Sequence, residues 1–477
     1  MAKFNSPYFQ RNMAMKSVIC IGITVWSLLA VTGVSSSSAA EAPSPAPSIV
    51  INLDECVHMA LKAAPELGEA ESDIALATSR LDEAKSYRFP QISITTLAGP
   101  APTAAKTDIN PVVQTDVTFS INSLTWFTSA DATIIQPLYT FGKISENMKA
   151  ATHGIEVDRS RKQQRANEIV QKVHEYYYGL LLAREMRELV LEIEEILIKA
   201  REKAGKLLAQ GSDSVDEVDL YKLDAFSGIA TKYLEEAKKG EALALAALKA
   251  RMGMPADANL VTATERLVIA EVDIPGLETF VEQGNSRRPE FKQIAEGLKA
   301  RTALVEAAKA NYYPDIFLGG LFSWAYADNR DRINNPYITD PFKHLNAGVA
   351  LGARWKLDFG ITGAKVAAER AQYNRLLSTK EYAATNIPLQ IKKYYLDLIE
   401  ARNSAAATRG AYLNAKKWTV TAVANFDFGM GPAKDIFEAL QAYSSMRSDY
   451  FKSIYNYRVA AANLDYATNE PLRPLEK

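Results

Sequence analysis

Two long stretches of the chain carry apolar or small side chains at every seventh position and contain almost no proline. The first runs from Gly142 to about Leu208 and the second from Gly360 to about Phe428. The repeating positions are Ile169, Tyr176, Ala183, Val190, Leu197 and Ala204 in the first stretch, and Ile391, Leu398, Ala405 and Tyr412 in the second. A seven-residue period predicts coiled-coil helices, each roughly 100 Å long. Pro388 interrupts the second stretch and predicts a kink there.

Short segments between these helices have a period of two instead. The segment "AGVALGARWKL" from Ala347 and the segment "DIFLGGLFSWAY" from Asp315 each place apolar side chains on one face. In the first half of the chain, Val117, Phe119 and Ile121 alternate with polar residues. Alternation alone favours an ordinary half-buried sheet, because the signal that each strand of a membrane barrel gives is weak. An apolar face of this kind also suits lipid.

The same order of elements occurs twice along the chain. Phe141-Gly142 in "LYTFGK" returns as Phe359-Gly360 in "KLDFGI", 218 positions later, and Gly211 returns as Gly429. Further upstream three more residues recur 224 positions later: Pro65, Lys85 and Pro90 match Pro289, Lys309 and Pro314. The chain is therefore predicted to be two tandem units. Each contains a helix, two strands, a long helix, a tip turn and a further helix.

The first forty residues have the three parts of an export signal. Three basic residues precede an apolar run, "VICIGITVWSLLAVTGV" from Val18, and small residues follow it up to Ala40. The pattern predicts cleavage after Ala40, with an uncleaved membrane anchor as the alternative. Only Cys56 then remains, because Cys20 lies within the signal, so no internal disulfide forms. We expect a signal peptide at 1–40, a first unit at 41–275 and a second at 276–477.

Charge and hydropathy exclude two classes of protein. Removal of the signal leaves 52 basic and 56 acidic residues, a net charge of −4, so we expect no nucleic-acid partner. No later segment reaches the 18 or so apolar residues of a spanning helix. A membrane crossing would therefore use strands, and four strands are too few to close a barrel, which needs about eight.

The sequence contains no pattern that is typical of an enzyme. The histidines lack metal-ligand spacing; they are His58, His153, His174 and His344. No glycine-rich phosphate loop or nucleophile elbow occurs, and the acidic run "EIEE" from Glu192 is interpreted as a charged helix face. We therefore expect no catalysis, no cofactor and no metal.

Together, these features resemble the TolC family of outer-membrane efflux proteins. The features are the export signal, the two units, "P-x-I" at each helix-to-strand switch, "PLYTFG" and "KLDFG" at each strand-to-helix switch, and a glycine at each tip. The resemblance covers about Leu53 to Asn469. It implies a mostly α fold with membrane β structure: a homotrimer in which four strands per chain form a 12-stranded β-barrel, continued by a long α-helical coiled-coil barrel.

The resemblance also implies a function and a location. It implies the exit duct of a tripartite efflux or type I secretion system in the Gram-negative outer membrane, extending into the periplasm and passing drugs, small molecules or proteins. The implied partners are outer-membrane lipid, a periplasmic adaptor (membrane fusion) protein and an inner-membrane transporter. The alternative is a periplasmic helical-hairpin adaptor or scaffold protein. Adaptors of that kind have one hairpin and more β structure around it, so the two full units argue against this alternative.

The tip turns carry the candidate functional residues. In "QGSDSVDEVD" we expect a helix that restarts with a capping box of Ser214 and Glu217. In "FGMGPAKDIFEAL" Pro432 suits the first helical position. We predict that both turns contact the adaptor, through Gly211, Asp213, Ser214, Glu217, Gly429, Gly431 and Lys434.

Two acids beyond the second tip are candidates for a channel entrance. Asp435 and Glu438 stand three apart and so share a helix face. By the resemblance, they match acidic positions that ring the closed periplasmic aperture, and the alternative is that they are solvated acids near a helix N-terminus. Some members of the resembled family lock the tip with a tyrosine and an arginine, where this chain has Phe426 and Gly431. We therefore expect a different lock, with Lys434 as the candidate partner.

Overall fold

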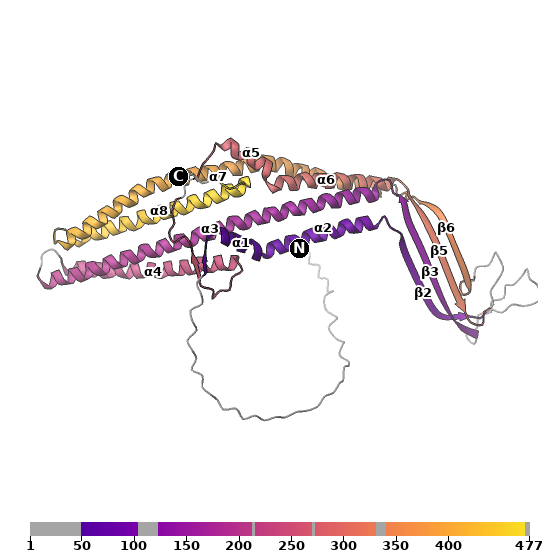
Figure 1. The fold of residues 1–477 in the computed structure, drawn as a ribbon, viewed down its shortest axis with the longest axis horizontal. Helices are drawn as coiled ribbons and strands as arrows, with labels where there is room; N and C mark the ends of the chain where they lie inside the picture. The colour runs from indigo at the N-terminus through magenta and orange to yellow at the C-terminus, as the bar shows by residue number, and fades with distance from the viewer. Residues whose placement is uncertain (1–48, 104–122, 212–214, 270–271, 331–339, 473–477) are drawn as a thin grey trace, which may run out of the picture. The chain divides into compact units, whose positions relative to one another are not determined.

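The computed structural model of the protein describes residues 49–103, 123–211, 215–269, 272–330 and 340–472 (Figure 1). Several sequence predictions fall outside the described residues. They concern the signal peptide at 1–40, the alternation of Val117, Phe119 and Ile121, and the tip residues Asp213 and Ser214.

Each half of the described chain contains two helices, two strands, one long helix and one further, shorter helix, in that order. The first half consists of α1 (Leu53–Ala63), α2 (Pro65–Ser86), β2 (Gln91–Pro102), β3 (Leu124–Tyr139), α3 (Lys143–Ala209) and α4 (Glu217–Arg251). The second half consists of α5 (Leu277–Arg287), α6 (Pro289–Lys309), β5 (Asp315–Ala327), β6 (His344–Arg354), α7 (Ile361–Asp427) and α8 (Ala433–Thr468). Two short strands, β1 (Ile49–Ile51) and β4 (Leu260–Thr262), pair in parallel. The repeated order is the one that the sequence predicts, with one further short helix at the start of each half.

The two long helices, α3 and α7, have the same length of 67 residues. At 1.5 Å per residue each is roughly 100 Å long. α7 runs through Pro388 as one helix, so the proline does not interrupt it. Proline removes one helical hydrogen bond and crowds the preceding turn, which bends a helix without ending it; the kink predicted at Pro388 stays a prediction.

Most of the predicted seven-residue positions of α7 are buried, although Tyr412 is half-buried, and those of α3 are buried only in part. Ile391, Leu398 and Ala405 are fully buried. In the middle of α3, Tyr176 is half-buried, whereas its neighbour Tyr177 is buried. A straight helix drifts away from a strict seven-residue repeat, and α3 packs against different helices along its length. The buried stripe of α3 therefore shifts by about one position.

The helices pack in two rows of four, one at each end of the long helices. Next to the sheet the order is α2, α3, α6, α7, and towards the tips it is α4, α3, α8, α7. The long helices α3 and α7 belong to both rows, and the short helices pair up along them (Figure 1). α7 therefore forms one outer side of both rows, while α2 and α4 form the other.

The strands form one antiparallel sheet in the order β2, β3, β5, β6 (Figure 1). Directly opposite residues share a face, and the register pairs Phe322 with Ala347 and Leu318 with Leu351. The apolar faces predicted for β5 and β6 are therefore one surface, which β3 and β2 continue. Trp126, Val349 and Leu351 on this surface are each 71–77% exposed. Such a surface is unusual for a protein in water.

The passage from strand to helix is the same in both halves. Phe141 and Phe359 have φ of 49° and 47°, and each is followed by a glycine with positive φ. A phenylalanine with positive φ is uncommon, so its occurrence at both switches indicates one turn used twice. At the first switch, the ring of Phe141 stacks on Tyr313 with centroids 5.0 Å apart.

Candidate functional site at the helical tips

The two long helices end in the same kind of turn, at Gly211 and Gly429. Both glycines have a φ of 72°, a backbone conformation that residues with a Cβ adopt only under strain. The Gly429 N–H donates to the Phe426 carbonyl (3.0 Å), and the Met430 N–H donates to the Asn425 carbonyl (2.8 Å). These two bonds make a Schellman motif. Gly211 donates to the carbonyl three residues before it at 3.0 Å. The structure thus places both predicted tip glycines just beyond a helix end.

The helix after the first tip turn begins differently from the prediction. α4 starts at Glu217, and its N-cap is Asp216, whose carboxylate accepts from the Asp219 N–H at 2.8 Å. The carboxylate of Asp219 accepts from the Asp216 N–H at 3.5 Å. The predicted box of Ser214 and Glu217 is therefore wrong. The observed box is formed by Asp216 and Asp219, two residues further along the chain. A carboxylate at the N-cap also interacts favourably with the positive N-terminus of the helix dipole.

The two candidate aperture acids, Asp435 and Glu438, lie on the exposed side of α8. α8 begins at Ala433, so Pro432 is its N-cap, one residue before its predicted place. The Lys434 amine lies 3.5 Å from the Glu438 carboxylate, with both side chains more than half exposed. Such an exposed pair contributes little to stability. In the isolated chain both acids therefore face solvent, with Lys434 beside one of them.

The opposite side of α8 packs into a core that both tip turns share. Phe426 is 1% exposed in this core, and the ring of buried Phe437 stacks on that of Phe226, an exposed residue at the edge of the core, with centroids 4.7 Å apart. The other buried members include Leu197, Ala204, Val215, Leu223, Ile436 and Leu440. A Cβ added at Gly431 would lie 3.2 Å from the Cβ of Asn425, so a larger residue there would crowd the turn. The two tips are thus held to each other by apolar packing.

A polar cluster between α3 and α8 was missed by the sequence analysis. The Tyr443 hydroxyl donates to the Glu192 carboxylate at 3.0 Å, and Arg447 also pairs with Glu192. Arg447 lies 4.0 Å from buried Glu185, where burial raises the pKa of the carboxyl. The run "EIEE" is interpreted from the sequence as a charged helix face; Glu192, whose side chain is 40% exposed, is in addition a contact between α3 and α8. Tyr443 and Arg447 stand four residues apart and so share one face of α8. This spacing in the sequence could have indicated that α8 presents hydrogen-bond donors to acids such as Glu185 and Glu192.

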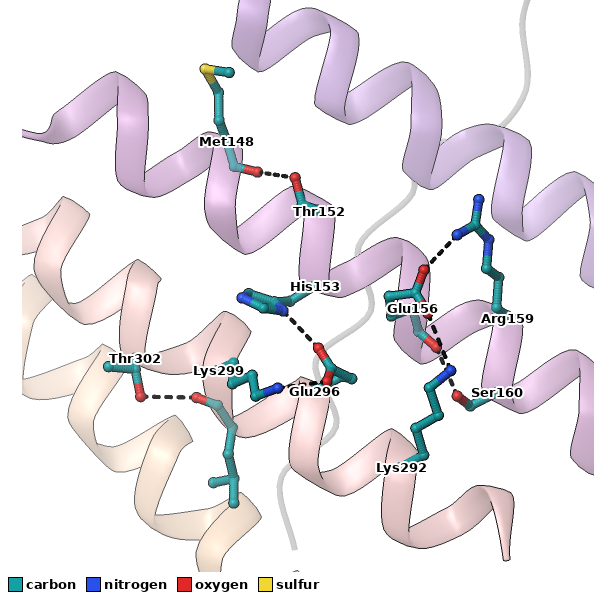
Figure 2. Close-up of polar contacts among 11 residues, drawn as sticks. Met148, Thr152, His153, Glu156, Arg159, Ser160, Lys292, Glu296, Lys299 and Thr302 are labelled. Atoms are coloured by element: carbon teal, nitrogen blue, oxygen red, sulfur yellow. Dashed lines mark hydrogen bonds and ion pairs between the residues drawn. The ribbon is translucent and has the colours of Figure 1, made fainter. Parts of the chain in front are cut away.

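A second polar seam joins α3 to α6 and so connects the two halves of the chain (Figure 2). His153 Nδ1 lies 2.7 Å from the carboxylate of Glu296, which also accepts from Lys299 at 2.8 Å. Lys292 donates to Glu156 at 3.3 Å. The hydrogen bonds from Lys299 and then His153 hold the pKa of the Glu296 carboxyl below its usual value. His153 is thus a contact between helices.

The parts of the chain that the structure describes hold neither a metal cluster nor a membrane-spanning helix. No group of three or more His, Cys, Asp or Glu side chains there could hold a metal ion. None of the described helices is both long and apolar enough to cross a membrane. Cys56 is buried, and burial raises the pKa of its thiol to about 12, so it is not a reactive thiolate.

Most of the chain matches one family model and a common fold. The model is described as "Outer membrane efflux protein" and matches residues 56–221 and 281–470. The Campylobacter jejuni CmeC outer membrane channel superposes with a TM-score of 0.72 at 17% identity, over 94% of this chain and 96% of that one. A search of curated protein sequences finds no match.

Two further solved structures have the same fold. The outer membrane protein VceC from Vibrio cholerae gives a TM-score of 0.70 at 15% identity, over 88% of this chain and 96% of that one. The open state of the Neisseria gonorrhoeae MtrE outer membrane channel gives 0.69 at 14% identity, over 88% and 89%. At such low identity these likenesses establish the fold alone.

Proposed function

The chain belongs to the outer membrane efflux protein family, and from this premise we propose that three copies form one duct, fed from an inner-membrane transporter through a periplasmic adaptor. As a member of that family, the protein is an exit channel in the outer membrane that extends into the periplasm. The family, the TolC-like fold, the function and the location predicted from the sequence are thereby confirmed. The alternative of a periplasmic adaptor is not favoured.

The sheet is the observation that carries the proposal of a trimer. Its outer strands, β2 and β6, each pair on one side only and have no second neighbouring strand among the described residues, and one face is mostly exposed and mostly apolar. Unpaired strand edges cannot remain in a bilayer, because their backbone groups would lack hydrogen-bond partners. Four strands cannot close alone, but twelve strands from three copies can.

The helical rows support the same assembly. On α7, Tyr382, Leu389 and Leu396 are exposed and follow each other at seven-residue intervals. On α4, at the other side of the row towards the tips, Tyr221 and Tyr233 are exposed. A seven-residue apolar stripe suits a neighbouring helix. We infer that the α7 side of one copy packs against the α2 and α4 side of the next, so that the helices continue the barrel as a tube.

The tips provide the proposed aperture and the proposed adaptor contact. Asp435 and Glu438 project from the exposed side of α8, and threefold symmetry would bring six such carboxylates to one axis. The turns at Gly211 and Gly429, together with exposed Glu217 and Lys434, form the end of the chain furthest from the sheet. We infer that the adaptor binds at that end. We also propose that the two units meet between residues 275 and 276, just before α5 begins at Leu277.

The trimer can be tested directly. Full-length protein purified in detergent should have the mass of three chains by light scattering, and it should form conducting pores when reconstituted in planar bilayers. A monomer that conducts no current would refute the proposed assembly. Strand-edge pairing is tested by adding a proline at Ile94, in the middle of the outer strand β2, because proline cannot donate a ladder hydrogen bond. Ile94→Pro should abolish the trimer.

A further inference from the structure

A cavity of about 1270 Å³ lies where the helices meet the sheet, bounded by α2, α3, α6 and α7. The strand residues that line it include Gln91, Ile135, Phe317 and Arg354. Each of these alternates along its strand with residues of the exposed apolar face, so all four belong to the opposite face. In the proposed duct the apolar face contacts lipid. The cavity therefore belongs to the inner wall of the duct.

The charged side chains of this cavity are mostly cationic. Six cations line it: Arg80, Lys143, Arg161, Arg301, Arg354 and Arg375. Three of them have acidic partners, in the pairs Lys143–Asp315 (2.7 Å), Arg161–Asp158 (2.6 Å) and Arg301–Glu369 (3.3 Å). The charge of these three cations is therefore balanced within the chain.

The remaining three arginines form what we call the basic wall: Arg80, Arg354 and Arg375. They come from α2, the end of β6 and α7, all are exposed, and none has an ion pair among the described residues. The one lining acid left over is Glu83, which accepts a hydrogen bond of 3.4 Å from Tyr87. Three unpaired arginines against one unpaired lining acid, Glu83, leave the wall with an excess of positive charge.

Apolar surface lies between these cations. It includes Ile144, Val157, Ile294, Leu304, Phe317 and Leu376. The Arg354 guanidinium lies over the Phe317 ring, 5.9 Å from its centroid. A Cβ at Gly352 would lie 2.6 Å from that ring, so the glycine leaves room for Phe317 on the neighbouring strand. A fixed aromatic ring with a guanidinium above it offers both an apolar contact and a charged one.

We propose that the basic wall is a binding station for organic anions that pass through the duct, namely molecules with a carboxylate, sulfonate or phosphate head and an apolar body. The planar guanidinium fork binds such heads through two parallel charge-assisted hydrogen bonds. The apolar side chains between the arginines receive the body of the molecule. The inference rests on the proposed function, because only the assembled duct makes this wall an interior surface, and it adds the class of cargo.

Binding of naphthalene-1-sulfonate to the detergent-solubilised full-length protein, measured by calorimetry, tests the proposal. The triple variant Arg80→Gln, Arg354→Gln, Arg375→Gln should bind this probe at least about tenfold more weakly, since one charge-assisted hydrogen bond is worth roughly that factor. The matched control replaces three exposed arginines of α7 outside the cavity, as Arg370→Gln, Arg402→Gln and Arg409→Gln. It has the same change in net charge and should bind like the parent.

The competitors distinguish the parts of the proposal. Inorganic sulfate should displace the probe only at much higher concentration than naphthalene-1-sulfonate itself, and neutral naphthalene-1-methanol should displace it poorly. Equal competition by sulfate would overturn the role of the apolar body. Equal binding by the parent and the triple variant, or no binding by the parent, would overturn the basic wall. Loss of trimer mass and conductance in the parent would instead refute the proposed duct, so the two failures are separable.

Discussion

Gly211 and Gly429, which lie 218 positions apart, end α3 and α7 with the same φ of 72°. Each is the first residue beyond the C-cap of its helix and donates its N–H to the carbonyl three residues earlier, at 3.0 Å in both turns. A backbone conformation that favours glycine thus occurs at equivalent places in both halves. Both halves of the chain therefore end their long helix with the same glycine turn, after which the chain reverses direction at the tip.

Gly429→Ala should destabilise the second tip turn. A residue with a Cβ at this φ costs about 1–2 kcal/mol, and no neighbouring atom lies within 4 Å of the added Cβ to cause a clash. The effect would therefore come from backbone strain alone. The midpoint of thermal unfolding, followed by circular dichroism, should fall. Gly410→Ala is the matched control, since Gly410 is an exposed residue inside α7 with equally open surroundings, and there alanine should stabilise by about 0.5–1 kcal/mol.

Arg447→Met should be among the most destabilising single changes in the row of helices towards the tips. It removes the cation that pairs with partly exposed Glu192 and lies 4.0 Å from buried Glu185, and leaving buried polar groups without a partner costs about 1–3 kcal/mol. Unfolding in guanidinium chloride should show the loss. Lys199→Met, which breaks the exposed pair with Glu195, should leave the midpoint unchanged. Equal effects of the two variants would contradict the role given to the cluster.

The sequence predicted most of the fold because long periods and duplication are strong signals. Helices of 67 residues leave a seven-residue pattern over many turns, and the glycine turns recur at a fixed offset. The capping box was mispredicted because two overlapping box patterns stand within a few residues, and only backbone geometry selects Asp216 over Ser214.

Contacts between distant segments could not be predicted in the same way. The pair of Glu192 with Arg447 joins residues 255 positions apart, and such pairs have no local pattern. The basic wall likewise combines Arg80, Arg354 and Arg375 from three elements. The sequence contains 55 basic residues, and no local pattern distinguishes these three arginines from the others.

Stability should fall as the pH rises from about 4 to 8 because of Asp465. Burial raises the pKa of its carboxyl from 3.8 to about 7 in the folded chain, although the Leu472 N–H donates to it at 2.7 Å. The contribution is complete below pH 3.8 and is lost as the pH passes 7, by about 4 kcal/mol at 1.36 kcal/mol per unit. Asp465→Asn should flatten this slope in unfolding midpoints measured at pH 5 and pH 8. Asp397→Asn, at an exposed position of α7, should keep it.

The proposed aperture predicts a cation-selective pore. Asp435 and Glu438 of three copies would place six carboxylates around one axis, where they attract cations and repel anions. A screening length of about 8 Å at physiological salt still spans a narrow entrance. Crowded carboxylates also favour a bound cation. Reversal potentials in a KCl gradient should therefore show cation selectivity, and a trivalent cation added on the periplasmic side should block the current.

Asp435→Ala with Glu438→Ala should abolish that block while the trimer stays intact, because both side chains lie on the exposed side of α8 and neither belongs to the tip core. The control replaces two other exposed acids, Glu188 and Glu202 of α3, by alanine, and the block should persist. Light scattering confirms that each variant is still a trimer. A double variant that is blocked as strongly as the parent would show that the constriction lies elsewhere, and that these two acids only favour the start of α8 in solvent.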